Sequence, residues 1–399
     1  MEKNFHKKIL ENGMTVLFEK RNLPVVSVAF AVKTGGIHET AEKKGISHFI
    51  EHMLYKGTPT RNSKKIAEEI EKNGGVLNGF TDETITAYWC KMPSKHLKKA
   101  LDVLSDLIKN PVFDLKEFEK ERKVIFEEIK MRRDNPGIYV LDEIQRMLFG
   151  TPFGIPVIGT YETMNSITRE EMKKRFGEIY QPNNMILCVV GNADFGEIAD
   201  FAEKNFSSKK GKIPEFKITE KNDSKTEKRK GIDQVNLIFA HHVPKYNDKK
   251  NYAAEVLSVL MAGGMSSRLF SEIREKRNLA YSVRGDSNVN KSYSYNFIHV
   301  GTTKGNMEKV KKLILEEFEK VAKNLDEREL KQTKEQIIGN YRIEMEDSQT
   351  QMVSLMMHEI NGKAEEFYEF EKNISKVKLE EVRELARIKK YSFFALVPE

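Results

Sequence analysis

Cysteine and tryptophan are scarce in this chain of 399 residues, which has two of the first and one of the second. Both cysteines, Cys90 and Cys188, lie in apolar segments, so buried free thiols fit better than a disulfide or a thiolate metal site. Long hydrophobic runs are missing too, since the longest, residues 185–190, is far too short to cross a bilayer. The start of the chain lacks the apolar segment of a secretory signal. We therefore expect a cytoplasmic protein with no membrane partner.

Neither sign of charge dominates the sequence. There are 67 Lys and Arg residues against 60 Asp and Glu residues, which gives a formal net charge of +7. The basic residues alternate with acidic ones along helical stretches such as residues 64–72, as on solvated helix faces. We therefore expect no nucleic-acid partner. The alternative, a basic nucleic-acid-binding protein, would predict a salt-sensitive complex.

Strands and helices are mixed along the chain rather than strictly alternating. Apolar runs predict strands at residues 9–19, 25–34, 84–91, 185–190, 235–240 and 292–301. Helical periodicity predicts helices at residues 45–55, 64–73, 95–109, 115–133, 253–260 and 268–277, and a helical pair over 307–346. This mixture favours the α+β fold class.

The length of the chain suits two globular domains, each with its own core. Residues 207–230 are rich in Lys, Glu, Ser and Thr and poor in apolar side chains, which predicts a linker. We therefore predict one domain over residues 1–206 and a second over residues 231–399.

The second half of the sequence repeats the plan of the first half. Asp114-Leu-Lys-Glu-Phe118 can be set beside Asp326-Glu-Arg-Glu-Leu330. Under this offset Glu121 falls on Thr333 and Glu128 falls on Asn340. Duplicated domains of which only the first retains ionisable metal ligands would explain the pattern, so we expect the chemistry in the first half.

A histidine pair supplies the strongest signal for chemistry. His48-Phe-Ile-Glu-His52 places two imidazoles four residues apart, on the same face of a predicted helix. Two such histidines can bind one metal ion from one side. Core or surface histidines are the alternative, but this composition gives only about 0.03 chance occurrences of the pattern.

A catalytic zinc ion takes three protein ligands and keeps one position open, so the pair needs a third ligand. Glu128 is the best candidate. Glu121 lies seven residues earlier on the same face of the predicted helix, so one carboxylate can bind the metal while the other bonds to a ligand histidine. Without the histidine pair, both would be read as solvated surface carboxylates.

Glu51 is the candidate general base. It would take a proton from the attacking water, whose pKa the metal lowers, and later pass it to the leaving amine. The order His-x-x-Glu-His is the inverted form of a metallopeptidase motif. Two histidines and one carboxylate suit one Zn²⁺ per chain, with Mn²⁺ or Co²⁺ as alternatives.

The whole chain resembles the pitrilysin-type (M16) zinc metallopeptidases, the group that includes mitochondrial processing peptidase and insulin-degrading enzyme, and among them the short single-chain type. The motifs that carry the resemblance are Ser47-His-Phe-Ile-Glu-His-Met-Leu-Tyr-Lys-Gly-Thr58, Glu121-Arg-Lys-Val-Ile-Phe-Glu-Glu128, Gln181-Pro-Asn-Asn-Met-Ile-Leu187, Gly263-Gly-Met-Ser-Ser-Arg-Leu-Phe270 and Ile273-Arg-Glu-Lys-Arg-Asn-Leu-Ala-Tyr281. The resemblance implies two homologous α/β-roll domains of the processing-peptidase-like metallohydrolase fold, each a mostly antiparallel sheet covered by helices. It also implies that Glu128 is the distal zinc ligand and that Glu121 orients a ligand histidine.

The resemblance further implies substrate-binding residues. Arg274 and Tyr281 look like the pair that the second domain contributes to bind substrate backbone and stabilise the oxyanion. Without the resemblance they would be an ordinary surface charge and a half-buried strand residue. Asn78, Gly79 and Phe80 resemble the edge strand on which such enzymes bind an extended peptide. A turn around Gly79 is the competing interpretation.

These observations favour an endopeptidase that acts on extended or unfolded peptides. Because one chain carries both the metal-binding half and the Arg/Tyr half, we expect a homodimer whose chains complete each other's active sites. A catalytically silent scaffolding subunit is the alternative from another class. The retained His48, Glu51, His52 and Glu128 argue against it.

Overall fold

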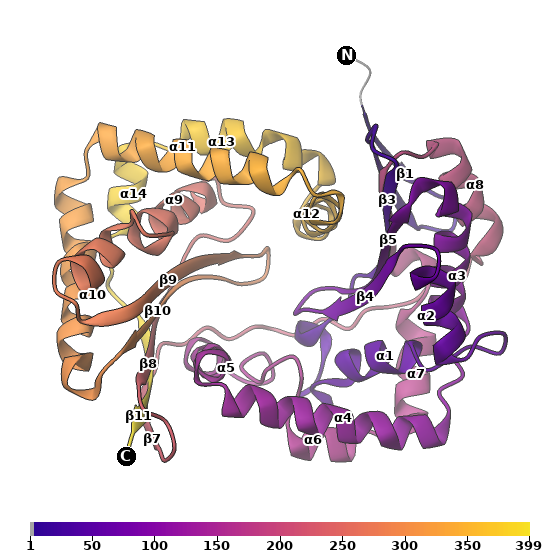
Figure 1. Ribbon diagram of the computed structural model, residues 1–399, viewed down its shortest axis with the longest axis horizontal. Helices are drawn as coiled ribbons and strands as arrows, with labels where there is room; N and C mark the ends of the chain where they lie inside the picture. Colours follow the sequence, from indigo (N-terminus) through magenta and orange to yellow (C-terminus); the bar gives the residue numbers. More distant parts are fainter. Residues whose placement is uncertain (1–3) are drawn as a thin grey trace. The chain divides into compact units, whose positions relative to one another are not determined.

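The computed structural model describes residues 4–399 (Figure 1). The chain forms two compact units, and each unit contains segments from both halves of the sequence. The first comprises the residues up to Lys130, Ile155–Lys217 and Glu344–Phe367. The second comprises Met131–Gly154, Ile218–Ile343 and Tyr368–Glu399.

The first unit is built on a six-stranded sheet. Its strands are β1 (Phe5–Ile9), β2 (Thr15–Lys20), β3 (Val25–Val32), β4 (Val76–Thr81), β5 (Thr86–Pro93) and β6 (Met185–Gly191). Their order is β1-β2-β6-β3-β5-β4, and only β2 and β6 pair in parallel. β4 is therefore an edge strand.

Both faces of this sheet are covered, which explains why β3 and β6 read as continuous apolar runs. Val28 and Phe30 point into the main core of the unit. The opposite face is covered by α12 (Ser348–Asn361), from near the end of the sequence, which contacts β3 and β6. The Ser27 and Ser348 hydroxyls meet there at 2.9 Å.

The second unit has a five-stranded sheet of β7 (Ser224–Arg229), β8 (Val235–His242), β9 (Ala280–Val289), β10 (Ser294–Thr302) and β11 (Ser392–Pro398). The order is β7-β11-β8-β10-β9, and only β7 and β11 are parallel. The predicted α+β class, with mostly antiparallel sheets covered by helices, is confirmed.

A helix from the first half of the sequence covers one face of the second sheet. It is α5 (Pro136–Leu148), which packs on β8 and β11. The Tyr139 hydroxyl donates to Glu227 on β7 at 2.9 Å, and Ser392 on β11 donates to the Met147 carbonyl at 3.1 Å. Each sheet is thus completed by one helix from the opposite half of the chain.

The remaining α-helices are α1 (Ile46–Leu54), α2 (Ser63–Glu71), α3 (Leu97–Lys109), α4 (Leu115–Asp134), α6 (Tyr161–Ser166), α7 (Arg169–Ile179), α8 (Phe195–Asn205), α9 (Asn251–Ala262), α10 (Met307–Asn324), α11 (Glu327–Glu344), α13 (Phe370–Lys376) and α14 (Leu379–Leu385). In the first unit α3 packs on β3 and β5, with α1 and α2 beside β4 (Figure 1). None of the helices in the described part of the chain is long and apolar enough to cross a membrane.

The structure differs from the sequence predictions in several segments, and it contains elements that the sequence did not predict, among them α5, α7, α8, α12 and β11. The run predicted over residues 9–19 is split by a turn at Gly13, which has a φ of +89° that favours glycine. The helix predicted over residues 268–277 contains a π-helix, Phe270–Glu275. Within the predicted linker, residues 224–229 form the edge strand β7, whose exposed position explains its polar sequence. The domain limits at residues 206 and 231 stay a prediction.

Candidate metal centre

The helix that carries the histidine pair is fixed at its first turn. The Glu39 carboxylate, itself 1 % exposed, accepts hydrogen bonds from the backbone N–H groups of Gly45 and Ser47 at 2.8 and 2.7 Å. A carboxylate at this end satisfies free N–H groups and complements the helix dipole. The opposite face of α1 is buried in the core through Ile46, Phe49, Ile50 and Met53. His48 and His52 are thereby left on the face that meets α4.

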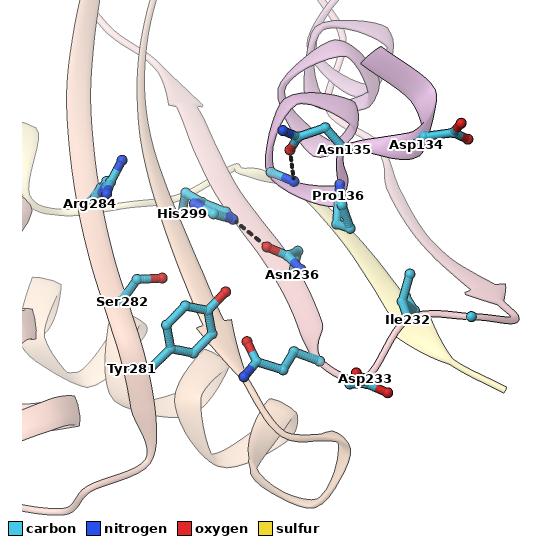
Figure 2. Close-up of a pocket in the computed structure, with 13 residues that line it drawn as sticks. Asp134, Asn135, Pro136, Ile232, Asp233, Asn236, Tyr281, Ser282, Arg284 and His299 are labelled. Atoms are coloured by element: carbon cyan, nitrogen blue, oxygen red, sulfur yellow. Dashed lines mark hydrogen bonds between the residues drawn. The ribbon is translucent and has the colours of Figure 1, made fainter. Parts of the chain in front are cut away.

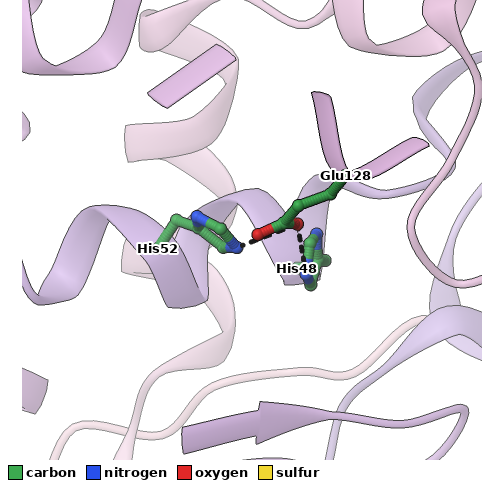
Figure 3. Close-up of side chains that lie close together, drawn as sticks. All are labelled: His48, His52 and Glu128. Atoms are coloured by element: carbon green, nitrogen blue, oxygen red, sulfur yellow. Dashed lines mark ion pairs between the residues drawn. The ribbon is translucent and has the colours of Figure 1, made fainter. Parts of the chain in front are cut away.

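The structure brings His48, His52 and Glu128 together (Figure 3). One ligand atom from each lies within 4.8 Å of the others. Glu128 Oε2 is 3.7 Å from His48 Nε2 and 3.6 Å from His52 Nε2. These separations exceed a hydrogen bond, and they suit three ligands that each bind one ion at about 2 Å. The residues therefore fit a divalent metal of the zinc type.

Glu121 orients one of these histidines. Its Oε2 lies 3.1 Å from His52 Nδ1, and its Oε1 lies 2.7 Å from the Lys56 ammonium group. Because an ionised carboxylate only accepts, His52 carries its proton on Nδ1 and turns the lone pair of Nε2 toward Glu128. Burial opposes ionisation of Glu121, but the hydrogen bonds from His52 and Lys56 hold its pKa below the ordinary value.

Negative charge around His52 exceeds positive charge. Burial alone would lower the pKa of His52, but the hydrogen bond to Glu121 and the charges of Glu128 and Glu51 raise it. Three carboxylates thus surround an imidazole, and among the described residues only the Lys56 ammonium forms an ion pair with them besides the two histidines. A bound divalent cation would balance this cluster.

Glu51 lies beside the three candidate ligands and is not one of them. Its Oε2 accepts a hydrogen bond from the Thr81 hydroxyl at 2.9 Å. Burial raises the pKa of Glu51 above its ordinary value; the charge of His52 and the Thr81 hydroxyl oppose this shift, and Glu128 adds to it. A raised pKa makes the carboxylate a stronger proton acceptor, as a general base requires.

The predicted substrate strand lies at the edge of the first sheet. Asn78, Gly79 and Phe80 belong to β4, which pairs with β5 on one side. No strand of residues 4–399 pairs with its other side. The segment is therefore strand rather than turn, and it has an edge to which an extended peptide could add.

The second unit brings Arg274 and Tyr281 together. Arg274 Nη1 donates to the Tyr281 carbonyl at 2.9 Å, and its guanidinium lies 4.8 Å from the centre of the Phe270 ring. The Tyr281 ring lies so close to the backbone of Gly301 that any side chain there would clash with it. Tyr281 as a whole is 51 % exposed.

Tyr281 also borders a cavity of about 540 Å³ in the second unit (Figure 2). His299, to which the sequence assigned no role, lines this cavity and its Nε2 donates to Asn236 Oδ1 at 3.1 Å. Burial, helped by the charge of Arg284, lowers the pKa of His299 to about 4. The imidazole is therefore neutral near pH 7.

Comparison with known proteins identifies the family. A zinc protease of Bacillus subtilis, uncharacterized and named YmxG, is 33% identical over 384 residues, which cover 94% of this chain and 93% of the relative. Residues 15–161 match the family model for insulinase (peptidase family M16), and residues 166–337 match the M16 inactive domain. The chain belongs to the M16 peptidase family. The resemblance seen in its motifs is thus confirmed at the level of the family.

Other members and structures agree with this M16 assignment. An uncharacterized zinc protease of Rickettsia felis is 35% identical over 85% of this chain and 84% of its own length. The crystal structure of a protease from Helicobacter pylori superposes with a TM-score of 0.92 over 99% of both chains, at 23% identity. A chain of complex III2 from Candida albicans superposes with a TM-score of 0.88, over 98% of this chain and 95% of its own length, at 17% identity. These likenesses to solved structures show the shared M16 fold.

Sequence reasoning missed three residues that support the candidate metal centre: Lys56, Thr81 and Glu39. Lys56 follows His52 by four residues, the same spacing that connects the two histidines, so the signal was present. Thr81 lies two residues after Gly79 on the same face of β4, but its contact with Glu51 spans thirty residues. Glu39 has no local signal, because it caps a helix from a neighbouring loop.

Proposed function

We propose that this M16 chain is a zinc-dependent endopeptidase that binds one Zn²⁺ through His48, His52 and Glu128. The observation that carries the proposal is the meeting of these three groups, with Glu51 beside them. The uncharacterized relatives from Bacillus subtilis and Rickettsia felis bear the name zinc protease, which supports the same activity.

Each protein group has a task in peptide hydrolysis. A bound Zn²⁺ would polarise the scissile carbonyl and lower the pKa of water. Glu51 takes a proton from the attacking water and passes it to the leaving amine nitrogen. Glu121, held by Lys56, keeps the Nε2 lone pair of His52 directed at the metal position.

The substrate is an extended or unfolded peptide. It would add to β4 at Asn78, Gly79 and Phe80, because the free edge there offers backbone hydrogen bonds. Arg274 and Tyr281 supply the donors for the substrate backbone and the developing oxyanion. The hydrogen bond from Arg274 to the Tyr281 carbonyl supports a joint role.

We propose a homodimer in which the chains complete each other's active sites. The proposal rests on one chain having both the metal centre and the Arg/Tyr pair. A strictly monomeric mass by light scattering at working concentration would contradict it. A cytoplasmic location fits the two buried free thiols, Cys90 and Cys188.

Cleavage of a quenched fluorescent peptide library tests the function. Metal-analysed wild type should hold about one zinc per chain and cut library peptides until a chelator is added. Glu51→Gln should keep the zinc and lose about 10²- to 10⁴-fold in kcat, because the amide cannot accept the proton. Glu127→Gln, an exposed neighbour of Glu128 on α4, is the matched control and should cleave normally.

A different pattern would favour the scaffolding alternative. If the wild type holds zinc but cuts no peptide, alone or with added chains of its own kind, a silent subunit of a larger assembly becomes the better account. Full activity of Glu51→Gln would instead retain the peptidase and remove Glu51 from its mechanism.

A further inference from the structure

We infer that Thr81 is a positioning residue, which fixes the Glu51 carboxylate in the place where it accepts the proton. The inference rests on the proposed function, since it takes Glu51 as the general base. It gives β4 a second task, because the strand expected to bind the peptide also holds the base.

The contact between the two residues is direct. Thr81 Oγ1 lies 2.9 Å from Glu51 Oε2, and the hydroxyl is the donor because an ionised carboxylate only accepts. A hydrogen bond to an ionised group is roughly twice as strong as one between neutral groups. The hydrogen bond from Thr81 is therefore strong enough to favour one orientation of the Glu51 carboxylate.

Thr81 is itself fixed by the hairpin between β4 and β5. It is the last residue of β4 and stands opposite Thr86 of β5. The turn that follows closes with a hydrogen bond from the Asp82 N–H to the Ile85 carbonyl at 2.8 Å. A β-branched side chain on a strand has few rotamers, so the position of the hydroxyl follows from that of the backbone.

Gly79 lies close to the other oxygen of the Glu51 carboxylate. A Cβ atom at Gly79 would lie 3.2 Å from Glu51 Oε1, 2.5 Å from the Tyr55 hydroxyl and 2.9 Å from the Ala87 carbonyl. The bare backbone of β4 therefore lies close against Glu51. Gly79 and Thr81 are two residues apart and share a strand face, so one strand faces both carboxylate oxygens.

In this arrangement β4 would position both the general base and the substrate. A peptide added to the edge of β4 takes its position from the strand that fixes Glu51, and α1 packs against that strand. Proton transfer depends steeply on such alignment. Loss of the Thr81 hydroxyl should therefore slow the chemical step more than it weakens peptide binding.

The test compares two substitutions at one position. Thr81→Val keeps the shape of the side chain and removes the hydroxyl, while Thr81→Ser keeps the hydroxyl. We expect kcat to fall about 10- to 100-fold in Thr81→Val, as for other residues that orient active-site groups, with KM and zinc content within about twofold of the wild type. Thr81→Ser should stay within about threefold of the wild type.

The chain offers a matched control on the same hairpin. Thr84 is 2 % exposed, and its hydroxyl has no hydrogen-bond partner within residues 4–399. Thr84→Val therefore removes a buried threonine hydroxyl without touching Glu51. It should leave kcat and KM unchanged.

A second measurement does not depend on turnover. A peptide hydroxamate bound to the zinc-loaded protein should give its hydroxyl proton to the Glu51 carboxylate, so its affinity depends on the position of that carboxylate. Its Kd should rise about tenfold in Thr81→Val and stay near the wild-type value in Thr81→Ser and Thr84→Val.

The outcomes separate the inference from the function on which it rests. Wild-type kcat and hydroxamate affinity in Thr81→Val would overturn it, and so would equal losses in Thr81→Val and Thr81→Ser, since the hydroxyl would then not matter. If the wild type cuts nothing but hydroxamate binding still separates Val from Ser, the positioning role stands and the proposed peptidase activity fails.

Discussion

Helices α4 and α11 follow the same plan in the two units but treat charge differently. In α4, Glu121 and Glu128 face the histidines of α1. At the matching positions of α11, the Thr333 hydroxyl bonds to a carbonyl of its own helix at 2.9 Å and Asn340 is exposed. The carboxylates of α4 therefore contact side chains of another helix, whereas at the matching positions of α11 one polar group bonds within its own helix and the other faces solvent.

The second unit still contains buried charge, but there it is paired. Arg268 lies 2.7 Å from Glu329 and 3.5 Å from Glu317, and Glu317 also contacts Lys320 at 2.5 Å. Two cations thus face two carboxylates. Three carboxylates lie around His52, and among the described residues one ammonium group, that of Lys56, pairs with them, through Glu121. The cluster thus has a surplus of negative charge that a divalent ion could balance. The candidate metal centre thus differs from the paired cluster of the second unit in its unbalanced negative charge.

Among the tests of this contrast, removing the proposed third ligand should have the largest effect. Glu128→Gln should lower zinc affinity by more than the roughly 100-fold typical of residues that only orient ligands. The reason is that an anionic ligand is lost and two histidines remain. Competition with a chromophoric chelator measures the effect, and Glu127→Gln is the control. Asn340→Glu should not create a second zinc site in the other unit; undiminished zinc affinity in Glu128→Gln would contradict the contrast.

Breaking the paired cluster around Arg268 should lower the stability of the fold and leave zinc affinity unchanged. Arg268→Met leaves Glu317, whose side chain is 3 % exposed, with Lys320 as its remaining ion pair. We expect a loss of about 2 to 3 kcal/mol in the free energy of unfolding, below the usual cost of a broken buried pair because Lys320 stays. Thermal unfolding measures this, with Arg328→Met on the exposed side of α11 as control. A fall in zinc affinity would show that the two clusters are not independent.

A smaller effect is expected from the residue that orients His52. Glu121→Gln keeps the size of the side chain but removes the anionic acceptor for Nδ1–H, so zinc affinity should fall about 10- to 100-fold. The loss must be smaller than that of Glu128→Gln, measured in the same chelator competition. Equal losses in both variants would mean that Glu121 itself binds the metal.

The smallest effect concerns acid stability of the second unit. His241 is buried, and within the described residues neither ring nitrogen has a hydrogen-bond partner. Burial, with a contribution from His242, lowers the pKa of His241 to about 3. Because the unfolded value is about 6.5, the unfolded state binds more protons below that pH, and the stability present above pH 6.5 is lost as the pH falls toward 3.

His241→Leu should remove this loss. At pH 5 the difference between the pKa values corresponds to roughly 2 kcal/mol. The thermal midpoint of His241→Leu should therefore fall less than that of the wild type between pH 7 and pH 5. Identical pH dependence in the two proteins would mean that His241 is protonated in the folded state.

Local patterns were enough to predict much of the fold. Apolar periodicity gave α1 and α4 within two residues of their ends, because each buries one face in its own unit. β9 was missed because it is an edge strand with the polar sequence Arg284-Gly-Asp-Ser-Asn288, so no alternation marks it. Neither α5 nor α12 was predicted as a helix, and even a predicted helix would not have shown which sheet it joins, since periodicity carries no such information.

The candidate site shows the same limit. The spacing of His48 and His52 is a property of one helix, so the sequence displays it directly. The contacts of Glu51 with Thr81 and of Lys56 with Glu121 join separate elements, and only the folded chain brings them together. The family motifs bridged part of this gap by pointing to Glu121 and Glu128.

Helix α12 is synthesised long after the sheet that it covers. It covers β3 and β6 of the first sheet, yet it spans Ser348–Asn361, close to the end of the chain. A ribosome that has delivered His48, His52, Glu128 and all six strands has still not delivered the helix that covers that face. Until α12 is made, the nascent first unit carries a bare apolar surface, which a chaperone or other parts of the chain must protect.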